Sequence, residues 1–178
     1  MKKRIIALGL LWCLSAVMLQ AARVDTVLVR SAAMNKDVKV VYVLPDKAIG
    51  KQACPVVYLL HGYGGNARSW VQLKPELPQM ADEKGIIFVC PDGKNSWYWD
   101  SPENPAYRYE TFVTSELVKY TDGNYATIPD RKARAISGLS MGGHGALWSA
   151  IRHKDVFGAA GSMSGGVDIR PFPQNWEM

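Results

Sequence analysis

Two segments near the start of the chain alternate apolar and polar residues, at 24–30 and 38–44. Alternation with a period of two is typical of strands that have one buried and one exposed face. We therefore expect these segments to pair as antiparallel edge strands. The polar stretch at residues 45–52 that follows them is expected to be a loop.

Short uninterrupted apolar runs follow at residues 56–60 and 86–90, and each is ended by turn residues. Such runs are typical of strands that are buried on both faces of a parallel sheet. Residues 134–137 and 157–164 are expected to form two further strands.

Helical spacing of apolar residues separates these strands. Residues 67–84 are compatible with a helix that Pro75 and Pro78 shorten or break. Residues 109–120 and 141–153 are expected to form two more helices. The alternation of strands and helices predicts an α/β fold: a mostly parallel sheet with helices on both faces.

Composition and charge exclude several classes of protein. The 178 residues include 21 Lys and Arg against 16 Asp and Glu, and 48% of them are hydrophobic. This composition excludes a disordered, collagen-like or coiled-coil chain. Three of the basic residues (Lys2, Lys3 and Arg4) lie at the very start. The rest of the chain therefore carries a small net charge, with basic and acidic residues mixed. We expect no nucleic-acid partner.

The first 22 residues are predicted to be a signal peptide. Residues 1–4 are cationic, residues 5–19 are almost entirely apolar, and small residues follow at 21 and 22. The apolar run is shorter than the roughly 20 residues that span a bilayer. We therefore expect a periplasmic or secreted protein with no stable membrane association. N-terminal sequencing of the exported protein should show that the mature chain begins near Arg23. An uncleaved anchor and a lipoprotein signal using Cys13 are the alternatives.

Cys54 and Cys90 are expected to be buried free thiols. They lie at opposite ends of two predicted strands, too far apart along parallel neighbours for a disulfide. No Cys and His cluster has metal-ligand spacing, so we expect no metal.

The segment Gly138-Leu139-Ser140-Met141-Gly142 fits the pattern G-x-S-x-G between a predicted strand and a predicted helix. In that context the serine sits on a tight turn and projects above the sheet as a nucleophile. The N–H of the next residue, at the start of the helix, can then bind an oxyanion. We expect Ser140 to be the nucleophile and the backbone N–H of Met141 to be one oxyanion donor. An idle serine in a structural turn is the alternative.

A second glycine-rich turn, His61-Gly62-Tyr63-Gly64-Gly65, follows the first buried strand. Loops of this type supply the other oxyanion donor, here the backbone N–H of Tyr63. A phosphate-binding loop is disfavoured because no Gly-Lys-Ser/Thr follows. We expect His61 to hold the loop in place and not to act as a general base.

The other histidines and an aromatic cluster complete the candidate residues. His144 is expected to pack or cap, and His153 to be solvated. Trp97, Tyr98 and Trp99 follow a strand at the sheet edge where α/β proteins bind ligands. They are expected to line a substrate pocket, with packing on their own rings as the alternative.

Three blocks of the chain resemble the esterase D-type esterases, which include S-formylglutathione hydrolases, feruloyl and acetylxylan esterases and mycolyltransferases. The blocks are PVVYLLHGYGG, NSWYWDSPENPAYRYETFVTSELVKY and ISGLSMGGHGALWSAIRHKDVFGAAGSMSGGVDIRPF, and the likeness covers residues 36–173. The resemblance implies an α/β-hydrolase fold and acyl-ester hydrolysis or acyl transfer without a cofactor. It also implies Ser140 as the nucleophile and the N–H groups of Tyr63 and Met141 as the oxyanion hole.

The chain departs from the family where the acid and the histidine of the triad are expected. Both follow the serine in this fold, yet no histidine follows His153 and the late acids are Asp168 and Glu177. We therefore expect residues 23–178 to be the N-terminal portion of one hydrolase domain, C-terminally truncated and weakly active or inactive. Asp168 stays open as the acid.

The sequence thus predicts a serine esterase that forms an acyl-enzyme on acyl or hydroxycinnamoyl esters, carbohydrate-linked in the leading interpretation. Two alternatives stay open: acyl transfer to a sugar hydroxyl, and a non-catalytic carbohydrate-binding remnant. The expected partner is the ester substrate, and the oligomeric state is not predicted.

Overall fold

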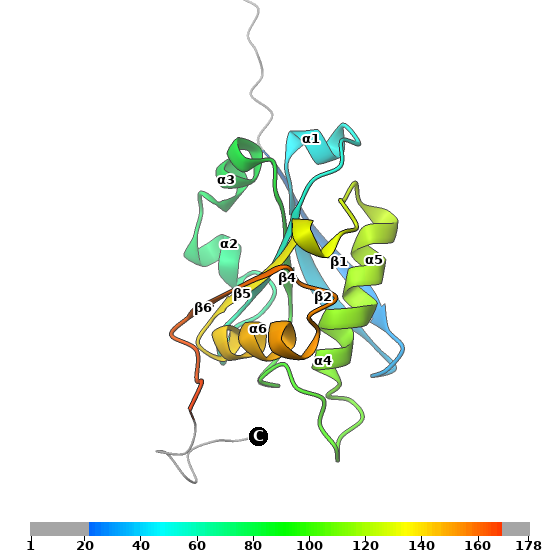
Figure 1. Ribbon diagram of the computed structural model, residues 1–178, viewed down its shortest axis with the longest axis vertical. Helices are drawn as coiled ribbons and strands as arrows, with labels where there is room; N and C mark the ends of the chain where they lie inside the picture. Colours follow the sequence, from blue (N-terminus) through cyan, green and yellow to red (C-terminus); the bar gives the residue numbers. More distant parts are fainter. Residues whose placement is uncertain (1–21, 169–178) are drawn as a thin grey trace, which may run out of the picture.

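The computed structural model describes residues 22–168, which form a six-stranded sheet in the order β1-β2-β4-β3-β5-β6 (Figure 1). The strands are β1 (Arg23–Ser31), β2 (Lys36–Leu44), β3 (Val56–Leu60), β4 (Ile87–Pro91), β5 (Arg134–Leu139) and β6 (Ala159–Met163). Strands β4, β3, β5 and β6 run parallel to one another, and β1 and β2 are antiparallel. The predicted signal peptide lies outside the described residues except for Ala22, and it stays a prediction.

The two alternating segments form the antiparallel pair that their pattern predicts. Their register runs from Arg23 opposite Leu44 to Ser31 opposite Lys36. Of these two strands, β1 lies at an edge of the sheet and β2 does not, because β2 also pairs with β4. The expected loop after β2 instead contains a short helix, α1 (Asp46–Ile49), which follows Pro45 and carries an acidic residue in its first turn. Such a residue favours a helix start.

Helices cover both faces of the sheet. On one face lie α2 (Ser69–Leu73) and α3 (Leu77–Lys84), which are separate helices where the two prolines were expected to break one. Leu77 and Ala81 pack there against Val41, Leu59 and Phe88.

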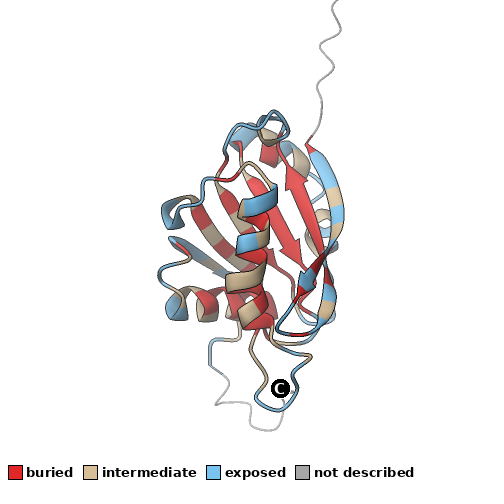
Figure 2. Ribbon diagram, turned by 90° about the vertical axis from the view of Figure 1, so that its right-hand side faces the viewer, coloured by how far each residue is buried: buried red, intermediate tan, exposed pale blue. Residues whose placement is uncertain are grey.

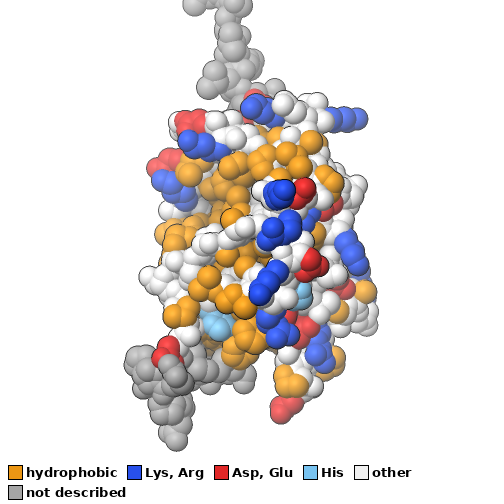
Figure 3. Space-filling view, in the orientation of Figure 1, with side chains coloured by type: hydrophobic (Ala, Val, Ile, Leu, Met, Phe, Trp, Pro, Cys, Tyr) orange, Lys and Arg blue, Asp and Glu red, His pale blue; other side chains and the backbone are white. Residues whose placement is uncertain are grey.

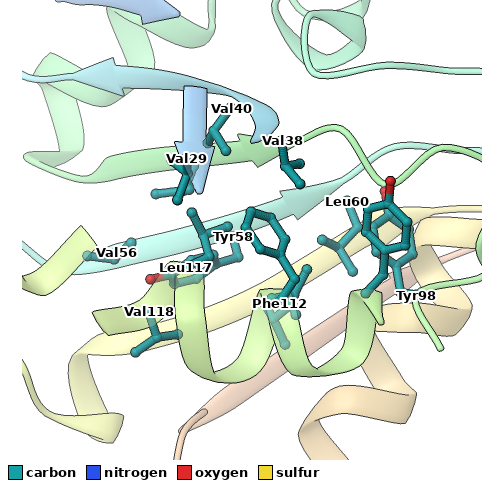
Figure 4. Packing of buried hydrophobic residues seen from close by; sticks show 14 of the residues in the cluster. Val29, Val38, Val40, Val56, Tyr58, Leu60, Tyr98, Phe112, Leu117 and Val118 are labelled. Atoms are coloured by element: carbon teal, nitrogen blue, oxygen red, sulfur yellow. The ribbon is translucent and has the colours of Figure 1, made fainter. Parts of the chain in front are cut away.

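The opposite face is covered by α6 (Met141–Arg152) and by a helical segment made of α4 (Tyr109–Thr111), a π-helical turn (Phe112–Glu116) and α5 (Leu117–Asn124). Phe112 and Leu117 from this segment pack against Tyr58 and Leu60 of β3 (Figure 4). Figure 2 shows α5 lying across the buried strands with its outer side exposed. The sheet therefore lies between two helical layers.

Cys54 and Cys90 are free and buried, as expected. Burial raises the pKa of the Cys90 thiol far above its usual range. Between residues 22 and 168, no helix is long and apolar enough to cross a membrane, and no three His, Cys, Asp or Glu residues form a group that could hold a metal ion.

Apolar side chains gather on the face that carries β5, β6 and α6 (Figure 3). Within the described part of the chain, β6 is the edge strand opposite β1, and most of its residues are exposed. Ile151 of α6 and Met163 of β6 are 65% and 42% exposed.

Glu110 ties the start of the helical segment to the end of α6. Its carboxylate accepts hydrogen bonds from the Trp148 indole (2.8 Å), Arg152 Nε (2.7 Å) and His153 Nε2 (2.8 Å). Burial opposes ionisation of this carboxyl group, but the hydrogen bonds from Arg152, Trp148 and His153 outweigh it, so the pKa of Glu110 lies below its ordinary value. The charged form therefore stabilises the folded chain.

We expect Glu110→Gln to lower the free energy of unfolding by about 1–3 kcal/mol at neutral pH. A carboxyl whose pKa is lowered by folding contributes stability above its unfolded pKa of about 4.3, and this contribution is lost as the pH falls towards the folded value. The difference between the parent and the variant should therefore shrink as the pH falls below about 4.3. Urea unfolding of both chains at several pH values measures this difference. A gap that widened on acidification would contradict the prediction.

Candidate active site

Ser140 occupies the turn between β5 and α6, and its backbone has φ 54° and ψ −116°. Positive φ is costly for a residue with a side chain and persists where the surrounding contacts impose it. Two contacts do so here: the Ser140 N–H donates to Met163 O (2.8 Å), and the Ser140 carbonyl accepts from the His144 N–H (3.0 Å). The residue is exposed, so its hydroxyl stands at the surface above the sheet.

The two glycines of the motif are required by close backbone contact. A Cβ on Gly138 would lie 2.3 Å from the carbonyl group of Gly142. A Cβ on Gly142 would lie 2.2 Å from the carbonyl oxygen of Leu60 at the end of β3. The turn can therefore fold this tightly only without side chains at those positions.

The second glycine-rich turn lies directly beside Ser140. Strands β3 and β5 are parallel neighbours with Leu60 opposite Gly138, so both chains leave the sheet at the same edge. A Cβ on Gly62 would lie 3.6 Å from the Ser140 Cβ and 3.4 Å from Leu139 O. The structure thus brings together the two turns that the sequence predicted to cooperate.

His61 fixes the orientation of this second turn. The Gly93 N–H donates to His61 Nε2 (2.9 Å), so Nε2 is an acceptor and the ring proton is on Nδ1. Nδ1 then donates to the Gly62 carbonyl at 2.7 Å. Because a trans peptide is planar, the N–H of Tyr63 points away from the Gly62 oxygen. The histidine therefore sets the direction of the amide expected to bind the oxyanion, and it has the holding role that the sequence predicted.

Further contacts hold His61 and its loop. The Tyr98 hydroxyl donates to the His61 carbonyl (3.2 Å), and Asn95 Oδ1 accepts from the Gly64 N–H (2.8 Å). Asp92 Oδ1 lies 3.8 Å from His61 Nε2 and Oδ2 lies 2.8 Å from Lys94 Nζ. Burial opposes the charge on Asp92, but the hydrogen bonds from the Lys94 ammonium and backbone N–H outweigh it, so the pKa of Asp92 lies well below its usual range. The only sequence signal of Asn95 and Asp92 is their place just after a buried strand, and neither was predicted to belong to the site.

Met141 begins α6, and its side chain is fully buried. The first N–H groups of a helix have no acceptor within the helix and carry its positive dipole end. Met141 thus has a free helix-start N–H in principle, and its role as the second oxyanion donor stays a prediction. Beside the turn lies a hollow of about 460 Å³. Its lining comprises Gly62, Tyr63, Gly65, Ser69, Gln72, Leu73 and Leu139.

The aromatic cluster is mostly part of the framework. Tyr98 is 0% exposed and Trp97 is 8% exposed. A Cβ on Gly93 or Gly145 would lie 2.3 or 2.6 Å from the Tyr98 ring, which shows how closely backbone surrounds it. The prediction that Tyr98 lines a substrate pocket is therefore wrong, because its ring is needed to fill the space between the β4 loop and α6.

Trp99 differs from its two neighbours, because it is partly exposed. It lines a hollow of about 550 Å³ formed by the loop before α4. The other lining residues are Asn95, Ser96, Asp100, Ser101, Pro102, Glu103, Asn104 and Tyr107. A substrate-binding role for Trp99 remains a prediction, and the nearly buried Trp97 has little surface to offer.

All three histidines of the chain are engaged in other contacts. His61 holds its loop, and His144 Nδ1 bonds the carbonyl of Gly166 (2.8 Å). His153 bonds Glu110 and is therefore not simply solvated, as the sequence had suggested. No histidine within residues 22–168 is shown hydrogen-bonded to the Ser140 hydroxyl.

A serine held at positive φ between a parallel strand and a helix, with a glycine-rich loop beside it, defines an α/β-hydrolase. The chain belongs to the esterase family whose model is described as "Putative esterase", which matches residues 31–177. This match confirms the resemblance drawn from the sequence.

Curated proteins and solved structures agree with this membership. The chain is 28% identical over 135 residues to an acetyl esterase of Caldicellulosiruptor saccharolyticus, covering 71% of this chain and 50% of that protein. It is 34% identical over 155 residues to the diacylglycerol acyltransferase/mycolyltransferase Ag85A of Mycobacterium gordonae, covering 82% and 43%. A solved ferulic acid esterase superposes with a TM-score of 0.71 at 31% identity, covering 82% of this chain and 61% of that one. The chain spans about half the length of the two curated relatives.

Proposed function

We propose that the chain carries the nucleophile and the oxyanion hole of a serine carboxylic-ester hydrolase. The observation that carries the proposal is the exposed Ser140 at φ 54°, with Gly62 of the second turn packed against its Cβ. Strain of this kind is retained where the geometry is used. The esterase family membership supports the same activity.

The geometry supports attack by Ser140 Oγ on an ester carbonyl carbon. The carbonyl oxygen gains the negative charge and accepts hydrogen bonds from the N–H groups of Tyr63 and Met141. The alcohol leaves with a proton, the acyl group stays on Oγ, and water then releases the acid. Removing one such donor costs roughly 10²–10³ in turnover.

A general base for this reaction is proposed to come from outside residues 22–168. A serine hydroxyl without an adjacent base is a weak nucleophile at neutral pH. Because His61, His144 and His153 are bound to other groups, we expect the 178-residue chain alone to acylate slowly. Asp168 is exposed and remains a proposal for the acid.

We propose acyl or hydroxycinnamoyl esters of carbohydrates as substrates. The Trp99 hollow supports this, because an aromatic ring among hydroxyl, amide and carboxylate groups suits a sugar or an aromatic acyl group. The similarity to an acyltransferase favours transfer of the acyl group to a sugar hydroxyl as a second candidate function. Residues 1–22 are proposed to direct export, which disfavours a cytosolic glutathione thioester as substrate.

The test is the reaction of the chain with p-nitrophenyl acetate, followed by mass spectrometry. We expect a slow release of one equivalent of nitrophenol and an acetyl group on the peptide that contains Ser140. Ser140→Ala should lose both signals and keep the same unfolding midpoint. Equal release by the parent chain and the variant would show that Ser140 is not the nucleophile.

A further inference from the structure

We propose that His144 is a positioning residue for the nucleophile turn, acting through the segment that follows β6. This inference rests on the proposed function of Ser140. Its structural part, the hydrogen bond from His144 to Gly166, can be tested without any measurement of activity.

The segment after β6 lies directly against the first turn of α6. A Cβ on Gly143 would lie 3.0 Å from the Gly165 Cα, and a Cβ on Gly165 would lie 2.8 Å from the backbone of Gly143 and 2.9 Å from that of His144. Two glycines, one on each segment, therefore let the backbones meet without side chains between them. A small displacement of this segment would therefore also displace the first turn of α6.

The last residue of β6, just before this segment, also bonds Ser140. Met163 O accepts the Ser140 N–H at 2.8 Å. The next residue, Ser164, has φ 50°, so a second residue with a side chain sits in the left-handed region beside Ser140. The Ser140 N–H is therefore bonded to the residue that directly precedes a second residue in a costly conformation.

His144 supplies a second contact on the far side of Ser164. Its Nδ1 lies 2.8 Å from the Gly166 carbonyl, and since a carbonyl only accepts, the ring proton is on Nδ1. The strained Ser164 is therefore held between two bonds: Met163 to Ser140 before it, and Gly166 to His144 after it. Both anchor points lie at the start of α6: Ser140 is its N-cap residue and His144 is in its first turn.

The His144 ring cannot swing away from this bond. Trp97, Trp99 and Trp148 surround it, with ring centroids 5.5, 5.2 and 6.2 Å away. The Trp148 ring is stacked at 17° on the imidazole, and its own N–H is held by Glu110. The imidazole is thus oriented by packing before it makes its hydrogen bond.

The remaining ring nitrogen argues against a purely packing role. His144 Nε2 is buried and has no hydrogen-bond partner among the described residues. A leucine or methionine would fill the aromatic surroundings without leaving a buried polar atom unpaired. Burying the unpaired Nε2 costs free energy, and the hydrogen bond from Nδ1 to the Gly166 carbonyl offsets this cost.

The test compares His144→Asn with His144→Leu in the full chain. Asparagine Nδ2 can replace the Nδ1 donor, whereas leucine fills space without a donor. We expect amide hydrogen exchange at Ser140 to speed up about tenfold or more in the leucine variant and to stay close to the parent in the asparagine variant. Exchange at Val89 in the sheet centre reports global unfolding and serves as the reference.

Three outcomes would overturn the proposal. The first is a proton on Nε2 of His144, read from ¹⁵N chemical shifts of the parent chain. The second is Ser140 exchange that changes only in parallel with Val89, which would mean a general loss of stability. The third is an asparagine variant that behaves like leucine. None of these depends on esterase activity, so failure of the proposed function, shown by Ser140→Ala, is a separate result.

Discussion

Gly142→Ala is expected to prevent the chain from folding. The added Cβ would lie 2.2 Å from Leu60 O and 2.7 Å from His61 O, both backbone atoms at the end of a central strand. Neither strand β3 nor helix α6 can move away without losing its packing against the core. We expect a loss of more than about 4 kcal/mol. That is a large part of the roughly 5–15 kcal/mol that stabilises a typical domain.

Gly123→Ala provides the matched control for this prediction. Gly123 lies in α5, is exposed, and has no atom within 4 Å of an added Cβ. Alanine should stabilise the helix there by about 0.5–1 kcal/mol. Urea unfolding followed by circular dichroism measures both variants. A folded Gly142→Ala chain with the parent's midpoint would show that α6 does not approach β3 as closely as the structure indicates.

Two substitutions of His61 should distinguish its effect on the orientation of the oxyanion loop from its effect on the stability of the fold. His61→Gln can still offer an acceptor to the Gly93 N–H but loses the donor to the Gly62 carbonyl. His61→Asn keeps a donor for Gly62 and loses the acceptor for Gly93. Each change leaves one buried group unpaired, so each should cost about 1–3 kcal/mol of stability.

The rate of Ser140 acetylation should differ between these variants. In the glutamine variant the peptide between Gly62 and Tyr63 is no longer held, so we expect the rate to fall about 10²-fold or more. The asparagine variant should stay within about tenfold of the parent. The rate is measured with p-nitrophenyl acetate after subtracting the Ser140→Ala background. A glutamine variant as fast as the asparagine variant would show that His61 does not orient the oxyanion amide.

The pattern of residues along the chain predicts most of the elements. Alternation indicated β1 and β2, continuous apolar runs indicated β3 and β4, and two prolines indicated the break between α2 and α3. These features depend on residues that are close together in the sequence. The short helix α1 and the π-helical turn at Phe112–Glu116 were not predicted, because each is a small departure from a pattern that fits a loop or a regular helix equally well.

The contacts of the site, in contrast, join residues that are far apart in the sequence. The partner of His61 is Gly93, that of Tyr98 is His61, and that of His144 is Gly166, at separations of 32, 37 and 22 residues. Tyr98 was expected to meet a substrate because it follows a strand at the sheet edge where α/β proteins bind ligands. The sequence contains no local signal that backbone from β4 and α6 closes around its ring.

By itself the sequence determined the order of strands and helices, the esterase family, and the serine and glycines of the nucleophile turn. These depend on spacing along the chain, which is visible in the order of residues. Only the tertiary structure decided which ring nitrogen of each histidine carries the proton, which aromatic side chains are buried, and which segment supports Ser140. Those properties depend on atoms brought together from distant parts of the chain, and the folded backbone alone sets their distances.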